Sequence, residues 1–228
     1  MAFNEELLLP HMIKHYRDRF PNCHIVVYNN NSTDNTKQIA ESNNCEVIFY
    51  NTHDQVNDEM LRTLKNNCWK TAQTDWVVVC DVDEMLNITE SELLNEDSNG
   101  STIITTEGWN MVNMEDNYDF DNIKYGIHEP MYNKKILFNK KYVNNINYMH
   151  GCHRCDPVGN VKYSEQIYKL YHYKYFNIEY SVMRHNLTAT RLSDINKAHN
   201  WGTQYLQPIE NVIQDFKNAR VIVKKIID

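Results

Sequence analysis

The sequence lacks any stretch approaching about 18 consecutive apolar residues, so we expect no transmembrane segment. It also lacks a basic start followed by an apolar run, which is the pattern of a secretory signal. The six cysteines are scattered along 228 residues and do not resemble the framework of a small disulfide-bonded protein. Reduced thiols and the missing signal together predict a cytoplasmic protein.

A surplus of basic residues is absent as well, because the formal net charge is -7. Broad binding to nucleic acid needs a basic face, so we expect no nucleic-acid partner. A single anionic small molecule can still bind to an acidic protein, since a metal ion neutralises a phosphate locally.

What the sequence does contain is typical of a folded globular protein. Hydrophobic residues make up 42% and charged residues 23% of the chain. The length suits one domain, and neither an internal repeat nor a linker composition is visible. We therefore expect a single domain with a substantial core.

Over the first 85 residues, helical and strand-like segments alternate. The strands are short apolar runs without polar alternation, which is typical of a parallel sheet covered by helices on both faces. The pattern therefore predicts an α/β fold with a mostly parallel sheet flanked by helices. The expected helices are 5–19, 36–44, 57–72, 177–190 and 209–227, and the expected strands are 23–28, 46–50, 75–80, 101–106, 135–138 and 168–173.

Two aspartates follow the strongest strand signal, the run 75–80. In an extended strand, residues i and i+2 point the same way, so Asp81 and Asp83 can face one point. Ligands of open α/β sheets gather at the carboxyl ends of the strands. Two carboxylates at such a place suit Mg²⁺ or Mn²⁺, which also take waters and substrate phosphates. The sequence predicts a metal site here, and a solvated acidic turn is the alternative.

A polar turn, Asn29–Thr36, lies between the first expected strand and the helix after it. Backbone amides at the start of a helix, together with Ser32, Thr33 and Asp34, can bind a nucleoside. Capping of the helix is the alternative role of these side chains.

Taken in order, these motifs resemble the family 2 type of GT-A glycosyltransferases. The family pattern is an N-E-E start, a D-x-x-S-T-D-x-T turn and a D-x-D strand end at similar spacing. The matching segments here are Asn4-Glu5-Glu6, Asn29–Thr36 and Asp81-Val82-Asp83. One subgroup, found in capsule and glycan gene clusters, is also similar in Gly151-Cys152-His153, Leu170–Lys174, Arg191-Leu192-Ser193 and Trp201-Gly202. The resemblance thus spans nearly the whole chain.

The resemblance implies a GT-A, Rossmann-like domain over residues 1–228. Residues from about 1 to 100 would bind the nucleotide sugar, and those from about 101 to 228 would bind the acceptor. The implied reaction moves a sugar from a UDP- or GDP-sugar to a glycan, lipid-linked sugar or protein, usually with inversion, and uses Mn²⁺ or Mg²⁺. The implied donor contacts are Asn4, Asn29, Asp34 and Asp81, although Asn29 stands where the family usually has an acid.

A late histidine or aspartate often completes the metal site in GT-A enzymes, and His172 resembles that residue. It lies in the tyrosine-rich segment Leu170–Lys174. Imidazole is an acceptable ligand for Mn²⁺. The implied ligand set is therefore Asp81, Asp83 and His172, and the alternative for His172 is a structural histidine.

An inverting transfer needs a base that accepts the proton of the acceptor hydroxyl. The candidates are His153, then Asp156, then Glu129. The segment His150–Cys155 also contains four potential zinc ligands, but we prefer an acceptor-site loop with His153 near the reacting sugar. Arg184 and Arg191 fall on a helical pattern, where surface salt bridges are the expected role, although Arg191 could approach a phosphate.

Two other functions compete with glycosyl transfer. A nucleotidyltransferase also combines an α/β sheet with metal-binding carboxylates, but it releases pyrophosphate rather than free UDP or GDP. The other alternative is a non-catalytic module that binds glycans or is stabilised by zinc.

Overall fold

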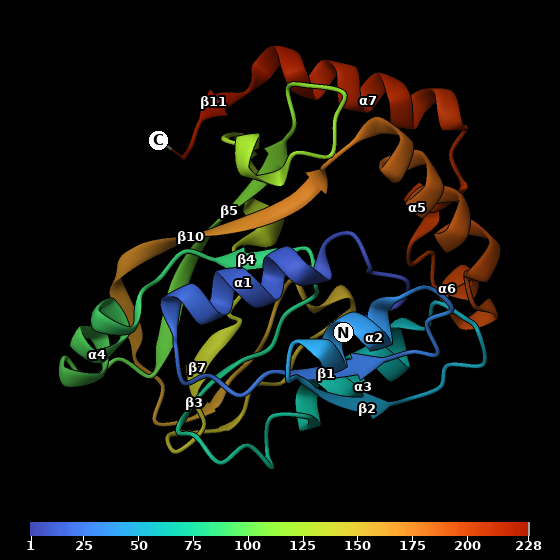
Figure 1. The fold of residues 1–228 in the computed structure, drawn as a ribbon. Helices are drawn as coiled ribbons and strands as arrows, with labels where there is room; N and C mark the ends of the chain where they lie inside the picture. Colours follow the sequence, from blue (N-terminus) through green and yellow to red (C-terminus); the bar gives the residue numbers. More distant parts are fainter. Residues whose placement is uncertain (228) are drawn as a thin grey trace.

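A seven-stranded mixed sheet forms the centre of the computed structural model, which describes residues 1–227 (Figure 1). Strands β5 and β10 run parallel at its middle, and every other pairing in this sheet is antiparallel. The spatial order is β11 (Lys224–Lys225), β6 (Tyr125–His128), β5 (Ile103–Val112), β10 (Tyr163–Tyr175) and β4 (Glu84–Leu86), and β7 (Leu137–Asn139) connects β5 to β3 (Trp76–Val78).

Two smaller sheets accompany the central one. Strands β1 (Val26–Asn29) and β2 (Glu46–Phe49) pair in parallel, as the alternating pattern predicts, and Ala2 bridges to Asn29 in the same direction. Strands β8 (Val143–Asn145) and β9 (Val158–Gly159) form an antiparallel pair. The predicted α/β class is thus confirmed, but the sheet is mixed rather than mostly parallel. An apolar run predicts burial of a strand and does not encode its direction.

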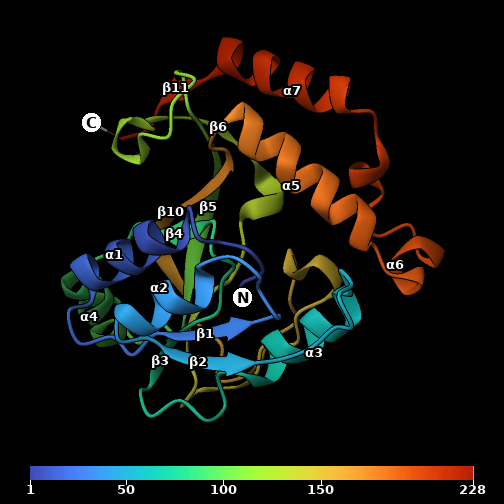
Figure 2. The ribbon, with the colours of Figure 1, turned by 45° about the vertical axis from the view of Figure 1, so that its right-hand side comes forward.

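The helices cover both sides of this framework. The first three are α1 (Leu9–Arg19), α2 (Thr36–Ser42) and α3 (Asp58–Asn67), all within predicted segments. At the other end of the molecule, α5 (Ile178–Arg191) and α7 (Ile209–Ile222) lie side by side (Figures 1 and 2). The remaining elements are α4 (Glu90–Ser98), α6 (Asp194–Ala198), and the short 3-10 turns η1 (Phe120–Asn122), η2 (Pro130–Tyr132), η3 (His150–Cys152) and η4 (Thr203–Leu206).

The main core lies between α1 and the central sheet. The segment 5–19 carries Leu8, Met12, Ile13 and Tyr16 at helical spacing, which predicts one apolar face, and all four are buried. They pack with residues of β4 and β10, which places the turn before β4 next to solid core. A rigid support of this kind is what a binding site needs.

Helix α3 differs from its predicted pattern. Its apolar spacing predicts Met60 on the buried face, yet Met60 is exposed and Lys65 is 2% exposed. A lysine is almost never buried without a partner of opposite charge. Its burial therefore indicates carboxylates in the interior beside α3, and these belong to the site described below.

Among residues 1–227, no helix is both long enough and apolar enough to cross a bilayer.

Candidate functional site

A cavity of about 290 Å³ lies between α3 and α5, beside the turn that joins β3 to β4. The elements that surround it can be followed in Figure 2. Charged and aromatic side chains make up half of its walls. They include Phe3, Glu5, Tyr50, Asp58, Asp81, Asp83, Glu84, Tyr132, Lys134, His153, His172, Arg184, Arg191 and Tyr205.

The two aspartates of the D-x-D motif lie on a tight turn and not at the end of an extended strand. Strand β3 ends at Val78 and β4 begins at Glu84. The turn is closed by the Glu84 amide, which donates to the Asp81 carbonyl at 3.2 Å. The Tyr173 amide also donates to the Asp83 carbonyl at 2.9 Å, which fixes the turn against β10. The alternation of side chains along a strand therefore does not apply, and the two carboxylates have different surroundings.

Asp81 is bound by buried lysines. Its Oδ2 lies 2.6 Å from Lys65 Nζ and 4.0 Å from Lys134 Nζ. Lys134 also forms an ion pair with Glu84. Burial would raise the pKa of Asp81, but the two ammonium groups outweigh it and hold that pKa well below its usual range. Asp81 is therefore ionised and already neutralised by the protein.

Asp83 has a different partner. Its Oδ2 lies 3.5 Å from His172 Nε2. The other ring nitrogen, Nδ1, lies 2.6 Å from Asn110 Oδ1, so Nδ1–H donates to that oxygen and Nε2 faces the carboxylate. Burial acts to raise the pKa of Asp83, and His172 lowers it below its usual value. A carboxylate and an imidazole nitrogen thus point toward one place in the cavity.

The carboxylates that line the cavity also differ in their ion-pair partners. Glu5 pairs with Arg184 at 2.8 Å, Asp81 with Lys65, and Glu84 with Lys134. Within residues 1–227, Asp83 has no lysine or arginine partner. Of the three carboxylates on the β3–β4 turn and the start of β4, Asp83 is thus the one that no lysine or arginine contacts directly in the described structure.

The residues near Asp83 fit a divalent cation, but as a smaller set than predicted. In the described part of the chain, no three His, Cys, Asp or Glu side chains converge as a metal site, so Asp81, Asp83 and His172 are not assembled around one point. Asp83 and His172 remain as an oxygen and a nitrogen ligand. Mg²⁺ and Mn²⁺ commonly take one or two protein ligands and complete their coordination with waters and phosphates.

Tyr132 separates the two histidines of the cavity. Its ring stacks on His172 with centroids 3.7 Å apart and meets His153 edge-on at 5.1 Å. Gly108 of β5 makes this placement possible, because a Cβ added there would lie 2.4 Å from the Cβ of Tyr132. The glycine lets η2 approach the sheet closely and so sets the position of the Tyr132 ring.

His153 is the predicted base that the structure places in the cavity. Its Nδ1 lies 3.0 Å from the Met131 carbonyl, so Nδ1–H donates and Nε2 keeps a free lone pair. Burial lowers the pKa of His153, and the nearby Lys134 ammonium adds to this effect. A neutral imidazole with an available Nε2 can accept a proton from a bound hydroxyl group.

The other two base candidates lie outside the cavity walls. Asp156 is exposed, and its backbone carbonyl accepts a hydrogen bond from Asn147. Glu129 caps η2, where its carboxylate accepts from the Met131 amide at 3.2 Å. Neither residue lines the cavity that contains Asp83, and a role as base stays a prediction for both.

The possible zinc ligands of the His150–Cys155 segment do not converge within the described residues. Burial raises the pKa of both Cys152 and Cys155 to about 11, so both are neutral thiols at pH 7. Zinc binds thiolates, and a raised thiol pKa disfavours them. His150 instead lies 2.7 Å from Glu59 and stacks on Trp201.

Of the four donor contacts implied by the resemblance, Asp81 lines the cavity, whereas Asn4, Asn29 and Asp34 do not and instead bind the backbone of the two motif segments. Asn4 Oδ1 accepts from the Thr33 amide at 2.8 Å, and Asn29 Oδ1 accepts from the Ser32 amide at 2.9 Å. Asp34 accepts from the amides of Glu6 and Thr36 at 3.0 and 2.9 Å. In this structure they tie the N-E-E segment to the polar turn, and contact with a donor stays a prediction for all three.

Replacing Asp34 by Ala should lower the free energy of unfolding by about 1–2 kcal/mol, because two backbone amides lose their acceptor. Urea unfolding measures the change. Asp194→Ala is the matched control, since the Asp194 side chain is 98% exposed, and its effect should stay within about 0.5 kcal/mol. Equal stability of Asp34→Ala and the control would contradict the structural role.

The sequence does not identify most of the cations that line the cavity. Arg184 and Arg191 are expected in surface salt bridges. Arg191 does pair with the exposed Asp54, at 2.9 Å, although its own side chain is 8% exposed, whereas Arg184 binds the buried Glu5. The Arg191 guanidinium lies 3.2 Å from the centre of the Phe3 ring. Its Nη2 has no hydrogen-bond partner within residues 1–227. Helical periodicity cannot reveal such residues, because their partners come from the other end of the chain.

The comparison with family models agrees with the resemblance seen in the sequence. The glycosyl transferase family 2 model matches residues 1–154. No curated protein matches this chain. Among solved structures, S. aureus TarS is similar at 15% identity and a TM-score of 0.46, over 97% of this chain and 42% of TarS. TarS 1–349 in complex with UDP-GlcNAc is similar at 15% identity and a TM-score of 0.45, over 96% of this chain and 70% of that one.

Proposed function

The chain belongs to glycosyl transferase family 2, and from that premise we propose that it transfers a sugar from a UDP- or GDP-sugar to a hydroxyl group of an acceptor. The observation that carries the proposal is the separation of the two motif aspartates. A lysine contacts Asp81 directly, while Asp83 faces His172 and has no lysine or arginine at ion-pair distance in the described structure. Asp83 and His172 would hold a divalent cation, and that cation would supply positive charge for the phosphates of a donor.

We propose Asp83 and His172 as the protein ligands of Mn²⁺ or Mg²⁺. Such an ion, when bound, stabilises the negative charge that develops on the departing nucleotide. Arg191 would contribute from the cavity wall, because its guanidinium is held over Phe3 and has an unpaired Nη2. A preorganised cation in a site of low dielectric stabilises phosphate charge strongly.

His153 would act on the acceptor. As the acceptor oxygen forms its bond to the anomeric carbon, the bond from that carbon to the phosphate oxygen breaks, and the hydroxyl proton moves to His153 Nε2. The Met131 carbonyl holds the ring in the tautomer that this step needs. Attack from the face opposite the leaving nucleotide inverts the anomeric carbon, which is the outcome that we propose.

The acceptor would enter from the side of η3 and α6, since Gly151, Asn196 and Gly202 line that part of the cavity. We propose that residues from about 101 to 228 supply most acceptor contacts and that residues from about 1 to 100 supply most donor contacts. A glycan, a lipid-linked sugar and a protein all carry a suitable hydroxyl group. Six free cysteines support the cytoplasm as the proposed compartment.

Replacing His153 by Gln should lower kcat by about 10²–10⁴-fold, because the base is removed while polarity is kept. In the native enzyme, kcat/KM should rise with pH and level off as His153 loses its proton. The midpoint should lie below the ordinary histidine pKa of about 6.5, since burial lowers the pKa of His153.

Initial rates between pH 5 and pH 8 measure both effects. The rising limb should disappear in His153→Gln. His24→Gln is the matched control, because His24 is an exposed residue outside the cavity. An unchanged limb in His153→Gln would contradict the assignment of the base.

The product distinguishes the proposed reaction from its main rival. A panel of UDP- and GDP-sugars with Mn²⁺ and simple sugar acceptors should yield free UDP or GDP. Release of pyrophosphate would instead indicate a nucleotidyltransferase. A glycan-binding module without activity would release neither product and would be detected by thermal shift with glycans alone.

A further inference from the structure

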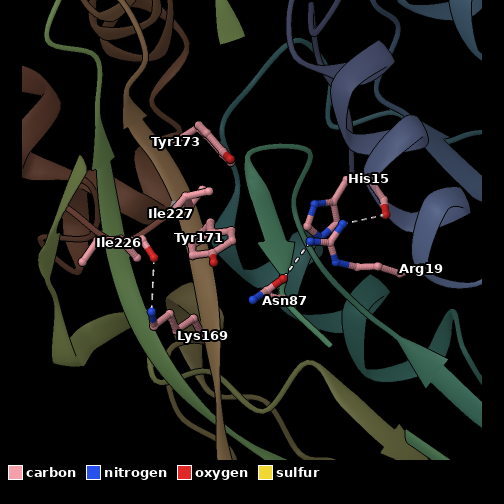
Figure 3. A pocket seen from close by; sticks show the side chains of 8 residues that line it. All are labelled: His15, Arg19, Asn87, Lys169, Tyr171, Tyr173, Ile226 and Ile227. Atoms are coloured by element: carbon pink, nitrogen blue, oxygen red, sulfur yellow. Dashed lines mark hydrogen bonds between the residues drawn. The ribbon is translucent and has the colours of Figure 1, made fainter. Parts of the chain in front are cut away.

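A second cavity, of about 350 Å³, lies between α1 and β10, next to β4 and residues 226–227. We propose that it binds a small molecule through a phosphate or carboxylate group. Figure 3 shows the side chains that line it, all labelled. They are His15, Arg19, Asn87, Lys169, Tyr171, Tyr173, Ile226 and Ile227.

This cavity is separate from the one that contains Asp83. Along β10, side chains alternate between the two faces of the sheet. Lys169, Tyr171 and Tyr173 point into the second cavity, whereas His172 points into the first. An occupant of the second cavity would therefore lie on the far side of β10 from the proposed donor site.

The second cavity has two cations and no acidic residue among its described walls. The Arg19 guanidinium donates to Asn87 Oδ1 at 2.7 Å and to the His15 carbonyl at 3.4 Å. Its Nε is buried and has no partner within residues 1–227. Lys169 Nζ donates to the Ile226 carbonyl at 3.2 Å. In a chain of net charge -7, two such cations in one cavity indicate that an anion completes the site.

Two tyrosine hydroxyls provide the second, independent observation. Tyr171 and Tyr173 are 5% and 4% exposed, and both line the cavity. Among the described residues, neither hydroxyl has a hydrogen-bond partner, and Figure 3 draws no bond from either one to the other residues shown. Burial raises the pKa of both phenols, so each keeps its proton and can donate a hydrogen bond. Because both tyrosines line the cavity and their hydroxyl groups have no protein partner, these groups are available to a ligand there.

The chemistry and size of the cavity define the class of ligand. A guanidinium, an ammonium and two phenols all donate hydrogen bonds, and together they match the oxygens of a phosphate or carboxylate. The volume leaves room for more than that group. The neighbouring Ile226 and Ile227 side chains offer apolar contact to the rest of the molecule. A sugar phosphate and an acidic sugar share these properties.

Isothermal titration calorimetry at constant ionic strength tests the proposal with three probes: inorganic phosphate, glucose 6-phosphate and glucuronate. The test variant is Arg19→Gln with Lys169→Met. The matched control is Arg17→Gln with Lys174→Met, which removes the same charge from the same helix and strand. Arg17 binds the Asn43 carbonyl, and Lys174 is exposed, so neither lines the cavity.

At least one probe should bind saturably to the native protein. The test variant should bind it at least about 10-fold more weakly, and the control should bind it as the native protein does. Tighter binding of glucose 6-phosphate would support a sugar phosphate, and tighter binding of glucuronate an acidic sugar. Equal affinity in the test variant, or no binding of any probe, would overturn the proposal.

A conservative variant keeps the test decisive if the double substitution does not fold. Tyr171→Phe with Tyr173→Phe removes two hydroxyl groups and keeps both rings in the core. It should weaken binding of the same probe by about 5-fold or more, because two donors are lost. Unchanged affinity in this variant would refute the role of the phenols and with it the proposed site.

Discussion

Asp83→Asn should abolish sugar transfer, with kcat/KM at least about 10³-fold lower, while the fold persists. The substitution keeps the shape of the side chain and removes the negative charge that we assign to the cation. Loss of a cation that stabilises the leaving nucleotide removes several kcal/mol from the transition state. The measurement is release of free UDP or GDP from a nucleotide sugar with Mn²⁺ present.

Stability should change little in the same variant. Asp83 has no lysine or arginine partner in the described structure, so its replacement leaves no buried ammonium or guanidinium unpaired. Burial is the main cause that raises the pKa of Glu5, and the negative charge of Asp83 adds to it. Replacing Asp83 by Asn therefore removes a repulsion between two carboxylates. Thermal unfolding should therefore coincide with that of the native protein. Full activity of Asp83→Asn in the presence of EDTA would contradict the assignment.

Asp81→Asn should have the opposite profile and destabilise the fold by about 3 kcal/mol. Lys65 is 2% exposed, and its ammonium group would keep no charged partner at hydrogen-bond distance. Removing one member of a buried ion pair costs about 3–5 kcal/mol, and the partial exposure of Asp81 places this case at the lower end. Urea unfolding at pH 7 measures the loss.

A double replacement provides the control for Asp81→Asn. Lys65→Met combined with Asp81→Leu removes both charges, so it should recover much of the lost stability. If Lys65→Met/Asp81→Leu is as unstable as Asp81→Asn, packing rather than charge explains the effect.

The pH dependence of the stability has a definite sign. The folded-state pKa of Asp81 lies below its ordinary value of about 4, so the pair stabilises the fold fully above that value. The contribution is lost as the pH falls further and the carboxylate takes up a proton. Asp81→Asn should therefore lose less stability than the native protein on acidification, and a parallel decline would argue against the ion pair.

The helices and strands of the N-terminal part were predictable because each carries a local pattern. The stripe of α1 and the apolar runs of β1 and β2 need only neighbours in sequence. Helix α4 also has a local signal, the capping box of Thr89 and Glu92, which periodicity alone misses. The directions of β5 to β11 depend on long connections, and no local pattern determines them.

The sequence motifs predict which residues lie in the candidate site, but they do not predict the contacts that each of these residues makes. The D-x-D sequence indicates two carboxylates near a ligand, and His153 and His172 do lie in the same cavity. Asp81 and Asp83 differ in their surroundings because Lys65 and Lys134 lie beside Asp81 alone, and both lysines come from other parts of the chain. Lys65 interrupts the apolar face of α3, and a lysine at such a position is the one signal that could have predicted a buried partner.

The binding of nucleotide by the native protein and by Asp83→Asn tests the central claim most directly. Isothermal titration calorimetry with UDP and with GDP, each with Mn²⁺ and then with EDTA, gives the affinities. The account predicts that the native protein binds one nucleotide at least about 10-fold more tightly with Mn²⁺, and that Asp83→Asn shows no such gain. An equal gain in both proteins would contradict the assignment of Asp83 as the ligand of the cation.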